Sequence, residues 1–169
     1  MSVYAAAPPV EFTTCRDYSI STSSMNGTNI RPINQPINQN MNSSSGKGFN
    51  FKFKMTYPDP SERRKECNKI LAQFPGKVPI ICEKDPISNI KYLIQTKYIV
   101  PKDLTVSQFN MMIRKKIELS KEASLYLLIN GKTAITGDCL ISEIYEKNKD
   151  PEDGILYIVY ASELTWGNN

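Results

Sequence analysis

Residues 154–169 read G-I-L-Y-I-V-Y-A-S-E-L-T-W-G-N-N, an apolar run followed by a short tail. Positions 155–161 are apolar on both alternations, which predicts a strand buried on both faces in the middle of a sheet. The tail carries Gly167 near its end, followed only by two asparagines. A frayed chain end is one interpretation, because termini are usually loose. The other is that the carboxyl end is the working part of the protein, and the rest of the chain favours it.

The absence of histidine is the most restrictive feature of the composition. It excludes Ser-His-Asp and Cys-His catalysis, H-E-x-x-H zinc sites and imidazole general bases, so an enzyme is not expected. The cysteines show neither C-x-x-C nor zinc-site spacing, so we expect no metal and no cofactor. With no signal peptide and no membrane-spanning run predicted, we expect free thiols in a cytosolic setting. The four cysteines are Cys15, Cys67, Cys82 and Cys139.

Charge is unevenly distributed along the chain. The net charge of +4 is too weak to indicate nucleic acid. Basic residues lead between 51 and 121, with clusters at 63–65 and 114–116, whereas acids lead between 138 and 163. One basic and one acidic surface indicate protein partners or an anionic membrane.

Residues 1–50 differ in composition from the rest of the chain. Ser, Asn, Thr, Pro and Gln dominate, and P-I-N-Q occurs at 32–35 and again at 36–39. Such a segment buries too little surface to offset the entropy of ordering it, which predicts a disordered low-complexity extension. It could serve as a tether, a phosphorylation target or filler.

Helix signals begin after an aromatic arm at 49–53, where phenylalanine occupies alternate positions. Asp59 can cap a helix, and Pro60 suits the first turn that follows. The apolar stripe of this helix is expected at Cys67, Ile70, Leu71 and Phe74, and its basic side at Arg63, Arg64, Lys65 and Lys69.

Capping and turn signals organise the second half. Thr105 with Gln108 predicts another capped helix, and Asn130-Gly131 predicts a two-residue hairpin turn. Strands are expected at 78–82, 92–100, 124–129, 132–135 and 155–161, with a short helix at 140–145. The expected order is helix, β, β, α, β, β, short α, β, which indicates one mixed α/β domain.

Ordered motifs run through this domain. They are Phe53-Lys54, Phe74-Pro75, V-P-I-I-C-E-K at 78–84, K-Y-I-V-P at 97–101, D-L-T-V-S-Q-F at 103–109, I-R-K at 113–115, L-L-I-N-G at 127–131, Ile144-Tyr145, Lys149-Asp150, Leu156-Tyr157 and Y-A-S-E at 160–163. With them the chain resembles the autophagy ubiquitin-like modifiers: the microtubule-associated light chain and GABA-receptor-associated proteins and their yeast counterpart. The resemblance covers residues 51–169 and does not extend to 1–50.

The resemblance implies a fold and a division of the chain. The fold class is α/β (α+β), a ubiquitin-like β-grasp with an additional N-terminal helix or helices. The expected parts are a disordered extension over 1–50, an N-terminal helical arm over 51–76, the ubiquitin-like domain over 77–167, and removable residues 168–169.

The resemblance also implies a fate for the carboxyl end. In the family a cysteine protease removes the residues beyond a glycine, and activating and conjugating enzymes join that glycine to phosphatidylethanolamine. By resemblance the acyl donor is Gly167, with cleavage before Asn168 and with Trp166 as an aromatic anchor for the protease. The lipid's two acyl chains would hold a cytoplasmic protein stably on autophagosomal membranes.

The family's second activity is to bind cargo receptors through short aromatic-x-x-aliphatic motifs, which add a strand to the sheet. By resemblance the aromatic pocket is lined by Glu66, Ile70, Pro79, Ile81, Lys97, Ile99 and Ile155. The aliphatic pocket is lined by Tyr98, Val100, Pro101, Leu104, Phe109, Met112 and Ile113. Lys77, Lys97 and Arg114 would pair with acids beside the motif. Periodicity alone leaves Ile81, Ile99 and Leu104 open between pocket and core and places Phe109 mainly in the core.

Departures from the family pattern leave alternatives open. Ile155 stands where the family usually has phenylalanine, and the segment before the second N-terminal helix is about one residue longer. Trp166-Gly167 also ends the related modifier that is joined to a protein instead of a lipid. A protein-conjugated modifier and an unconjugated peptide-binding scaffold are therefore the competing hypotheses.

Overall fold

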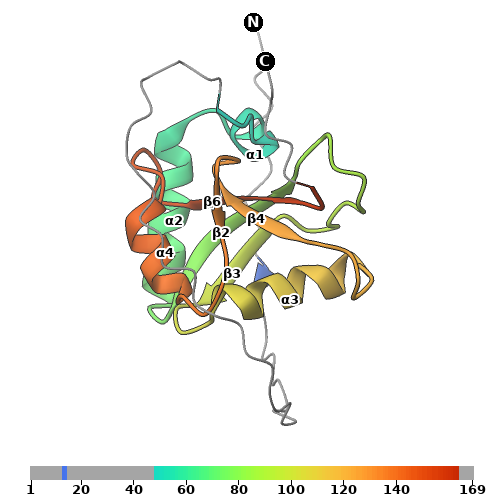
Figure 1. Ribbon diagram of the computed structural model, residues 1–169. Coiled ribbons are helices and arrows are strands. Elements are labelled where there is room, and N and C mark those ends of the chain that lie inside the picture. Colours follow the sequence, from blue (N-terminus) through green and yellow to red (C-terminus); the bar gives the residue numbers. More distant parts are fainter. Residues whose placement is uncertain (1–12, 15–47, 164–169) are drawn as a thin grey trace, which may run out of the picture. The chain divides into compact units, whose positions relative to one another are not determined.

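The computed structural model describes residues 13–14 and 48–163. The predicted extension over 1–50 and the predicted processing residues 166–169 thus fall almost entirely outside the described residues. The elements are β1 (Thr13–Thr14), α1 (Lys52–Thr56), α2 (Pro60–Gln73), β2 (Lys77–Lys84), β3 (Lys97–Pro101), α3 (Val106–Lys116), β4 (Tyr126–Ile129), β5 (Thr133–Ile135), α4 (Ile141–Asn148) and β6 (Leu156–Ala161) (Figure 1).

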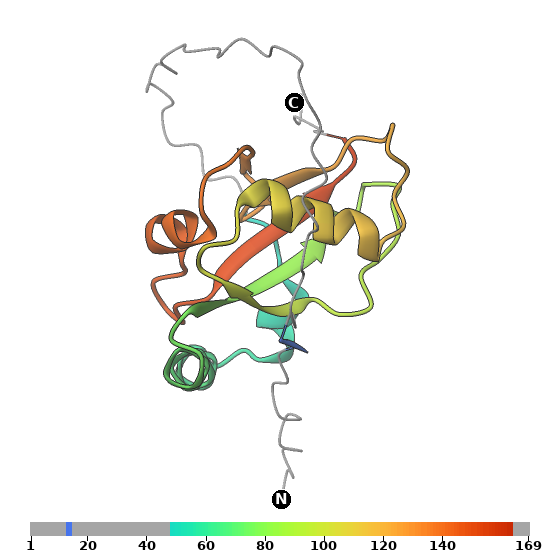
Figure 2. The same cartoon turned by 90° about the horizontal axis from the view of Figure 1, so that it is seen from below.

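The sheet is mixed and has the order β1-β3-β2-β6-β4-β5. β6 lies parallel to β2 and antiparallel to β4, and all six of its residues are buried. The predicted central strand is therefore confirmed. Helix α3 lies across one face of the sheet (Figure 2). This is the ubiquitin-like β-grasp, and α1 and α2 are its additional N-terminal helices.

Local signals place the ends of these elements. The Asp59 carboxylate accepts the Ser61 N–H at 2.8 Å and caps α2. Thr105 and Gln108 form the predicted capping box of α3. Asn130 and Gly131 have φ values of 51° and 72°, as the predicted hairpin turn requires. The ladder pairs Ile129 with Thr133, so three residues, 130–132, connect β4 to β5 instead of the predicted two.

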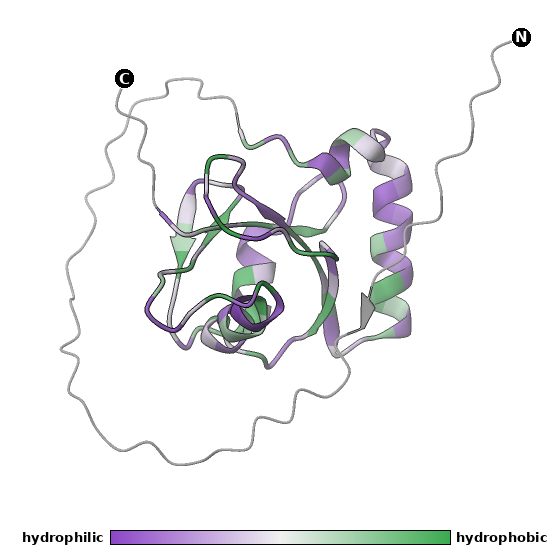
Figure 3. Ribbon diagram, turned by 90° about the vertical axis from the view of Figure 1, so that its right-hand side faces the viewer, coloured by the Kyte–Doolittle hydropathy of each residue, from purple (hydrophilic) through white to green (hydrophobic). Residues whose placement is uncertain are grey.

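Two hydrophobic clusters cover the two faces of the sheet, because successive side chains of a strand point to opposite sides. The helices carry both hydrophilic and hydrophobic residues, as expected where one side of each packs against a cluster (Figure 3). The α3-face cluster includes Val78, Ile80, Tyr98, Val100, Phe109, Ile113, Leu156 and Ile158. The α2-face cluster includes Phe51, Phe53, Tyr57, Cys67, Ile81, Ile155, Tyr157 and Val159.

Three expectations need correction. The strand predicted at 92–100 begins only at Lys97, because the preceding residues form a loop in which the Leu93 N–H donates to the Tyr160 hydroxyl at 2.8 Å. Leu140 is exposed and precedes α4 instead of packing within it. Arg63, assigned to the basic side of α2, is only 3% exposed. In addition, β1 was not anticipated, because it lies in a segment predicted to be disordered.

Candidate functional site

Strand β3 separates the two groups of residues that the sequence assigns to peptide pockets. Along β3, Tyr98 and Val100 face the α3-face cluster, and Lys97 and Ile99 face the opposite side by alternation. The two predicted pockets therefore lie on opposite faces of one strand. A peptide lying along β3 could reach both faces with alternate side chains.

The structure brings the predicted aromatic-pocket residues together on the α2 side of the sheet. Ile81 and Ile155 belong to the α2-face cluster. Ile70 of α2 and Ile99 of β3 are buried, at 3% exposure each. Pro79 is also buried, whereas Glu66 and Lys97 are half-buried. The set thus has an apolar floor with one acidic and one basic residue near the solvent.

The predicted aliphatic-pocket residues other than Pro101 gather on the α3 side, whereas Pro101 shares the side of Ile99 by alternation. Tyr98 and Phe109 are fully buried, and their ring centroids lie 6.1 Å apart in an edge-to-face arrangement. Phe109 is thus a core residue, as predicted. Leu104 is partly buried against the same cluster, and Pro101 ends β3 half-buried. Val100, Met112 and Ile113 complete the set and are buried.

The three predicted cationic residues differ in their surroundings. The Arg114 guanidinium donates to the carbonyl oxygens of Ser120, Lys121 and Ala123 and so closes the loop after α3. Lys97 Nζ lies 3.4 Å from the Tyr57 hydroxyl and 5.0 Å from the Tyr57 ring centroid. Lys77 Nζ lies 5.8 Å from the Phe74 ring centroid. Lys97 also pairs with Ile81 across β2 and β3, so it is the cation beside the aromatic-pocket residues.

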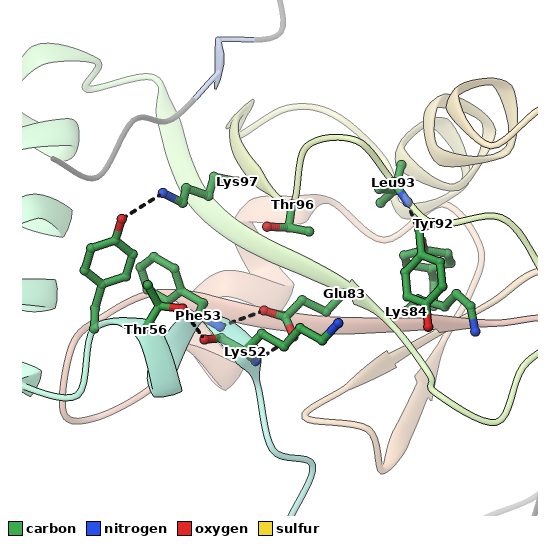
Figure 4. Close-up of a pocket in the computed structure, with 11 residues that line it drawn as sticks. Lys52, Phe53, Thr56, Glu83, Lys84, Tyr92, Leu93, Thr96 and Lys97 are labelled. Carbon is green, nitrogen blue, oxygen red and sulfur yellow. Dashed lines mark hydrogen bonds between the residues drawn. The ribbon is translucent and has the colours of Figure 1, made fainter. Parts of the chain in front are cut away.

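A cavity of about 280 Å³ lies between α1, β2 and the loop before β3 (Figure 4). At its wall, Glu83 accepts the backbone N–H groups of Lys52 and Phe53 at 2.8 and 2.9 Å. This carboxylate satisfies two donors at the start of α1, where intrahelical partners are lacking. Glu83 thus fastens α1 to the sheet next to the candidate site.

A buried ionic network fixes α2 against β6. Arg63 Nε donates to Asp153 Oδ2 at 2.7 Å, and the Tyr157 hydroxyl donates to the same oxygen at 2.7 Å. Burial alone would lower the pKa of Arg63, but the hydrogen bond to Asp153 raises it above its usual value. Burial and Asp153 raise the pKa of Tyr157, so its hydroxyl stays protonated. Sequence analysis missed this network, although Arg63 lies four residues before Cys67 and thus on the buried stripe.

The described residues offer little reactive chemistry. Cys67 and Cys82 are buried free thiols, and burial raises the pKa of each, so they are poor nucleophiles. Cys139 is free and exposed. Among residues 13–14 and 48–163 no group of acids and cysteines could hold a metal ion, and no helix is long and apolar enough to cross a membrane.

The fold is that of the ubiquitin-like proteins. A family sequence model described as "Autophagy protein Atg8 ubiquitin like" matches residues 62–167. The Autophagy-related protein 8 of Emericella nidulans is 43% identical over 117 residues, which is 69% of this chain and 97% of that protein. The protein of the same name from Pichia angusta is 46% identical over 109 residues, or 64% and 86% of the two chains.

A solved structure agrees with these sequence relatives. The crystal structure of Trypanosoma brucei ATG8 is 36% identical and has a TM-score of 0.63, covering 70% of this chain and all of that chain. The chain belongs to the Atg8 family of autophagy ubiquitin-like proteins. The predicted pocket, processing and domain assignments stay predictions.

Proposed function

We propose that this chain is a non-enzymatic modifier that is cleaved after Gly167, joined to phosphatidylethanolamine, and used on autophagosomal membranes to bind cargo receptors. Before conjugation it would reside in the cytoplasm. The chemistry would be carried out by a cysteine protease and by activating and conjugating enzymes. The chain itself would supply an acyl group and a surface for aromatic-x-x-aliphatic peptides.

The observation that carries peptide binding is the edge of β3. This strand is bonded to β2 on one side, and on the other side the two-residue β1 is its only partner among the described residues. Apolar residues assigned to the two pockets flank it on both faces. Main-chain pairing at such an edge provides affinity, and pockets for alternate side chains provide specificity.

Peptide binding can be tested with one charge reversal. A fluorescent peptide containing Glu-Glu-Trp-Ser-Ser-Leu should bind Lys97→Glu about tenfold more weakly than wild type, because acids beside the motif would face a carboxylate. Lys132→Glu, in the turn between β4 and β5, is the matched control and should bind like wild type. Equal weakening by both variants would leave no role for Lys97.

Conjugation is supported by the family match, which runs to residue 167, and by the small size of glycine, whose backbone can enter a narrow enzyme channel. Intact-mass measurement on chains from starved cells should show loss of Asn168 and Asn169 and gain of a diacyl lipid. Gly167→Ala should abolish both changes, whereas Asn169→Ala should leave them. A protein adduct at Gly167 would replace the lipid proposal by the protein-conjugated alternative, and an unchanged terminus would favour the unconjugated scaffold.

A further inference from the structure

The only described part of the first 47 residues lies along the candidate docking edge. β1 pairs with β3 in parallel, with Thr13 opposite Tyr98 and Thr14 opposite Ile99. The two strands lie side by side in Figures 1 and 2. A segment distant in sequence therefore adds a strand at the position where a docked peptide would add one.

Backbone alternation shows that β1 pairs with those backbone N–H and C=O groups of β3 that do not bond to β2. The Cys82 N–H donates to the Thr96 carbonyl, so the alternate β2 residues Val78 and Ile80 also turn toward β3. Their partners Val100 and Tyr98 are thereby engaged by β2. Lys97 and Ile99 turn their backbone groups to the other side, where β1 lies. A peptide bound along β3 needs these same groups.

The sequence around β1 resembles the ligand class of the proposed function. Residues 11–15 read E-F-T-T-C, an acid followed by an aromatic residue, two intervening positions and a cysteine. Cysteine behaves as a small hydrophobic residue when buried. β1 itself is the pair of intervening positions. The segment thus has the spacing of an aromatic-x-x-aliphatic motif, with cysteine at the aliphatic position.

We propose that β1 is an internal competitor for the β3 edge, which lowers the affinity of the unmodified chain for cargo peptides. This inference rests on the proposed peptide-binding function. Because β1 belongs to the same chain as β3, its pairing is intramolecular and does not depend on the concentration of the protein. If the paired form outnumbers the open form by about ten to one, the apparent affinity for a free peptide falls roughly tenfold.

The alternation supplies a matched pair of variants. Because the groups of Tyr98 are engaged by β2, the register turns the Thr13 N–H toward β3 and the Thr14 N–H away from it. Thr13→Pro removes a donor of the ladder, whereas Thr14→Pro removes one that faces outward, which an edge strand tolerates. Thr13→Pro should bind the Glu-Glu-Trp-Ser-Ser-Leu peptide about tenfold more tightly than wild type. Thr14→Pro should bind within about twofold of wild type.

Amide hydrogen exchange on the full chain provides a readout that needs no peptide. In Thr13→Pro the Ile99 amide should exchange at least about tenfold faster than in wild type, whereas the Tyr98 amide, bonded to β2, should not change. Equal peptide affinity of wild type and Thr13→Pro would overturn the competition while leaving peptide binding intact. If no variant bound the peptide, the proposed function would fail and the competition with it, whatever the exchange showed about β1.

Discussion

The two faces of the sheet are built differently. All three buried charged residues of the described chain, Arg63, Glu83 and Asp153, lie on the α2 side. The α3-face cluster contains no buried charge, and its polar atoms include tyrosine hydroxyls such as that of Tyr160, which accepts the Leu93 N–H. The α3 side therefore depends mainly on volume and shape, whereas the α2 side also depends on charged partners brought from α1, α2 and the turn before β6.

The two faces therefore have different structural roles. The α3 side completes the β-grasp, and its polar content is low because helix and sheet meet directly. On the α2 side, each buried charge is matched by hydrogen bonds, since an unmatched one would be costly. Those bonds fix where the N-terminal helices sit and hence the shape of the predicted aromatic pocket.

The largest expected effect is at Arg63. Arg63→Ala removes the guanidinium from Asp153 and should lower the free energy of unfolding by about 3–5 kcal/mol, because it leaves a buried carboxylate without its cation. Lys65→Ala, exposed on the same helix, should change it by less than about 0.5 kcal/mol. Urea denaturation measures both. A loss at Arg63 no greater than at Lys65 would remove the distinction between the two faces.

A smaller loss is expected at Glu83. Glu83→Gln replaces one accepting oxygen by an amide donor, so one of the Lys52 and Phe53 N–H groups loses its partner. We expect a loss of about 1–3 kcal/mol in the free energy of unfolding. Glu122→Gln, at an exposed position, should be neutral. If both variants unfolded at the wild-type urea concentration, Glu83 would not hold α1.

At its aliphatic positions the α3 side should respond to the volume of the side chain. Ile113 is fully buried, and Ile113→Val should cost about 0.5–1.5 kcal/mol through the lost methylene. Met111→Leu on the exposed side of the same helix should cost less than about 0.5 kcal/mol. A loss at Ile113 comparable to that at Arg63 would show that this side also relies on a specific contact.

An effect of similar size concerns Asp150, and this one depends on pH. Burial would raise the pKa of this carboxyl, but hydrogen bonds from Lys54, at 2.5 Å, and from the Glu152 N–H hold it below its usual value of 3.8. The ionised Asp150 carboxylate therefore contributes its full stabilisation of the folded state above pH 3.8. This stabilisation is lost as the pH falls through the lower pKa that Asp150 has in the folded protein. Asp150→Asn should lower stability by about 1 kcal/mol at pH 7. The difference should shrink in acid, and a difference that persisted at pH 2 would exclude this cause.

The sequence predicted the α3 side well and the α2 side only in part. Helical spacing identified Phe109 and Ile113, because apolar packing follows local periodicity. Arg63 was predicted to be exposed because it is charged, although its position in the helix lies on the buried apolar stripe. The role of Glu83 depends on partners about thirty positions away, which no local pattern reveals. The two-residue β1 exists only through its pairing with β3, so strand propensity could not predict it.

The sequence also predicted the helices and strands of the domain better than its loops. Residues 92–96 carry strand-forming side chains but are held as a loop by the Tyr160 hydroxyl, which also donates to the Lys91 carbonyl at 3.1 Å. Burial raises the pKa of Tyr160 to about 12, so this hydroxyl keeps its proton. Such a tertiary hydrogen bond overrides local propensity.

The most direct test of the account is an NMR titration of the isotope-labelled full chain with the Glu-Glu-Trp-Ser-Ser-Leu peptide. If a peptide docks along β3, the largest backbone shift changes should fall on β3 and on both flanking helices, α2 and α3. Shift changes confined to one face of the sheet, or centred on the β4–β5 hairpin, would contradict the claim that the peptide docks along β3 and contacts both faces.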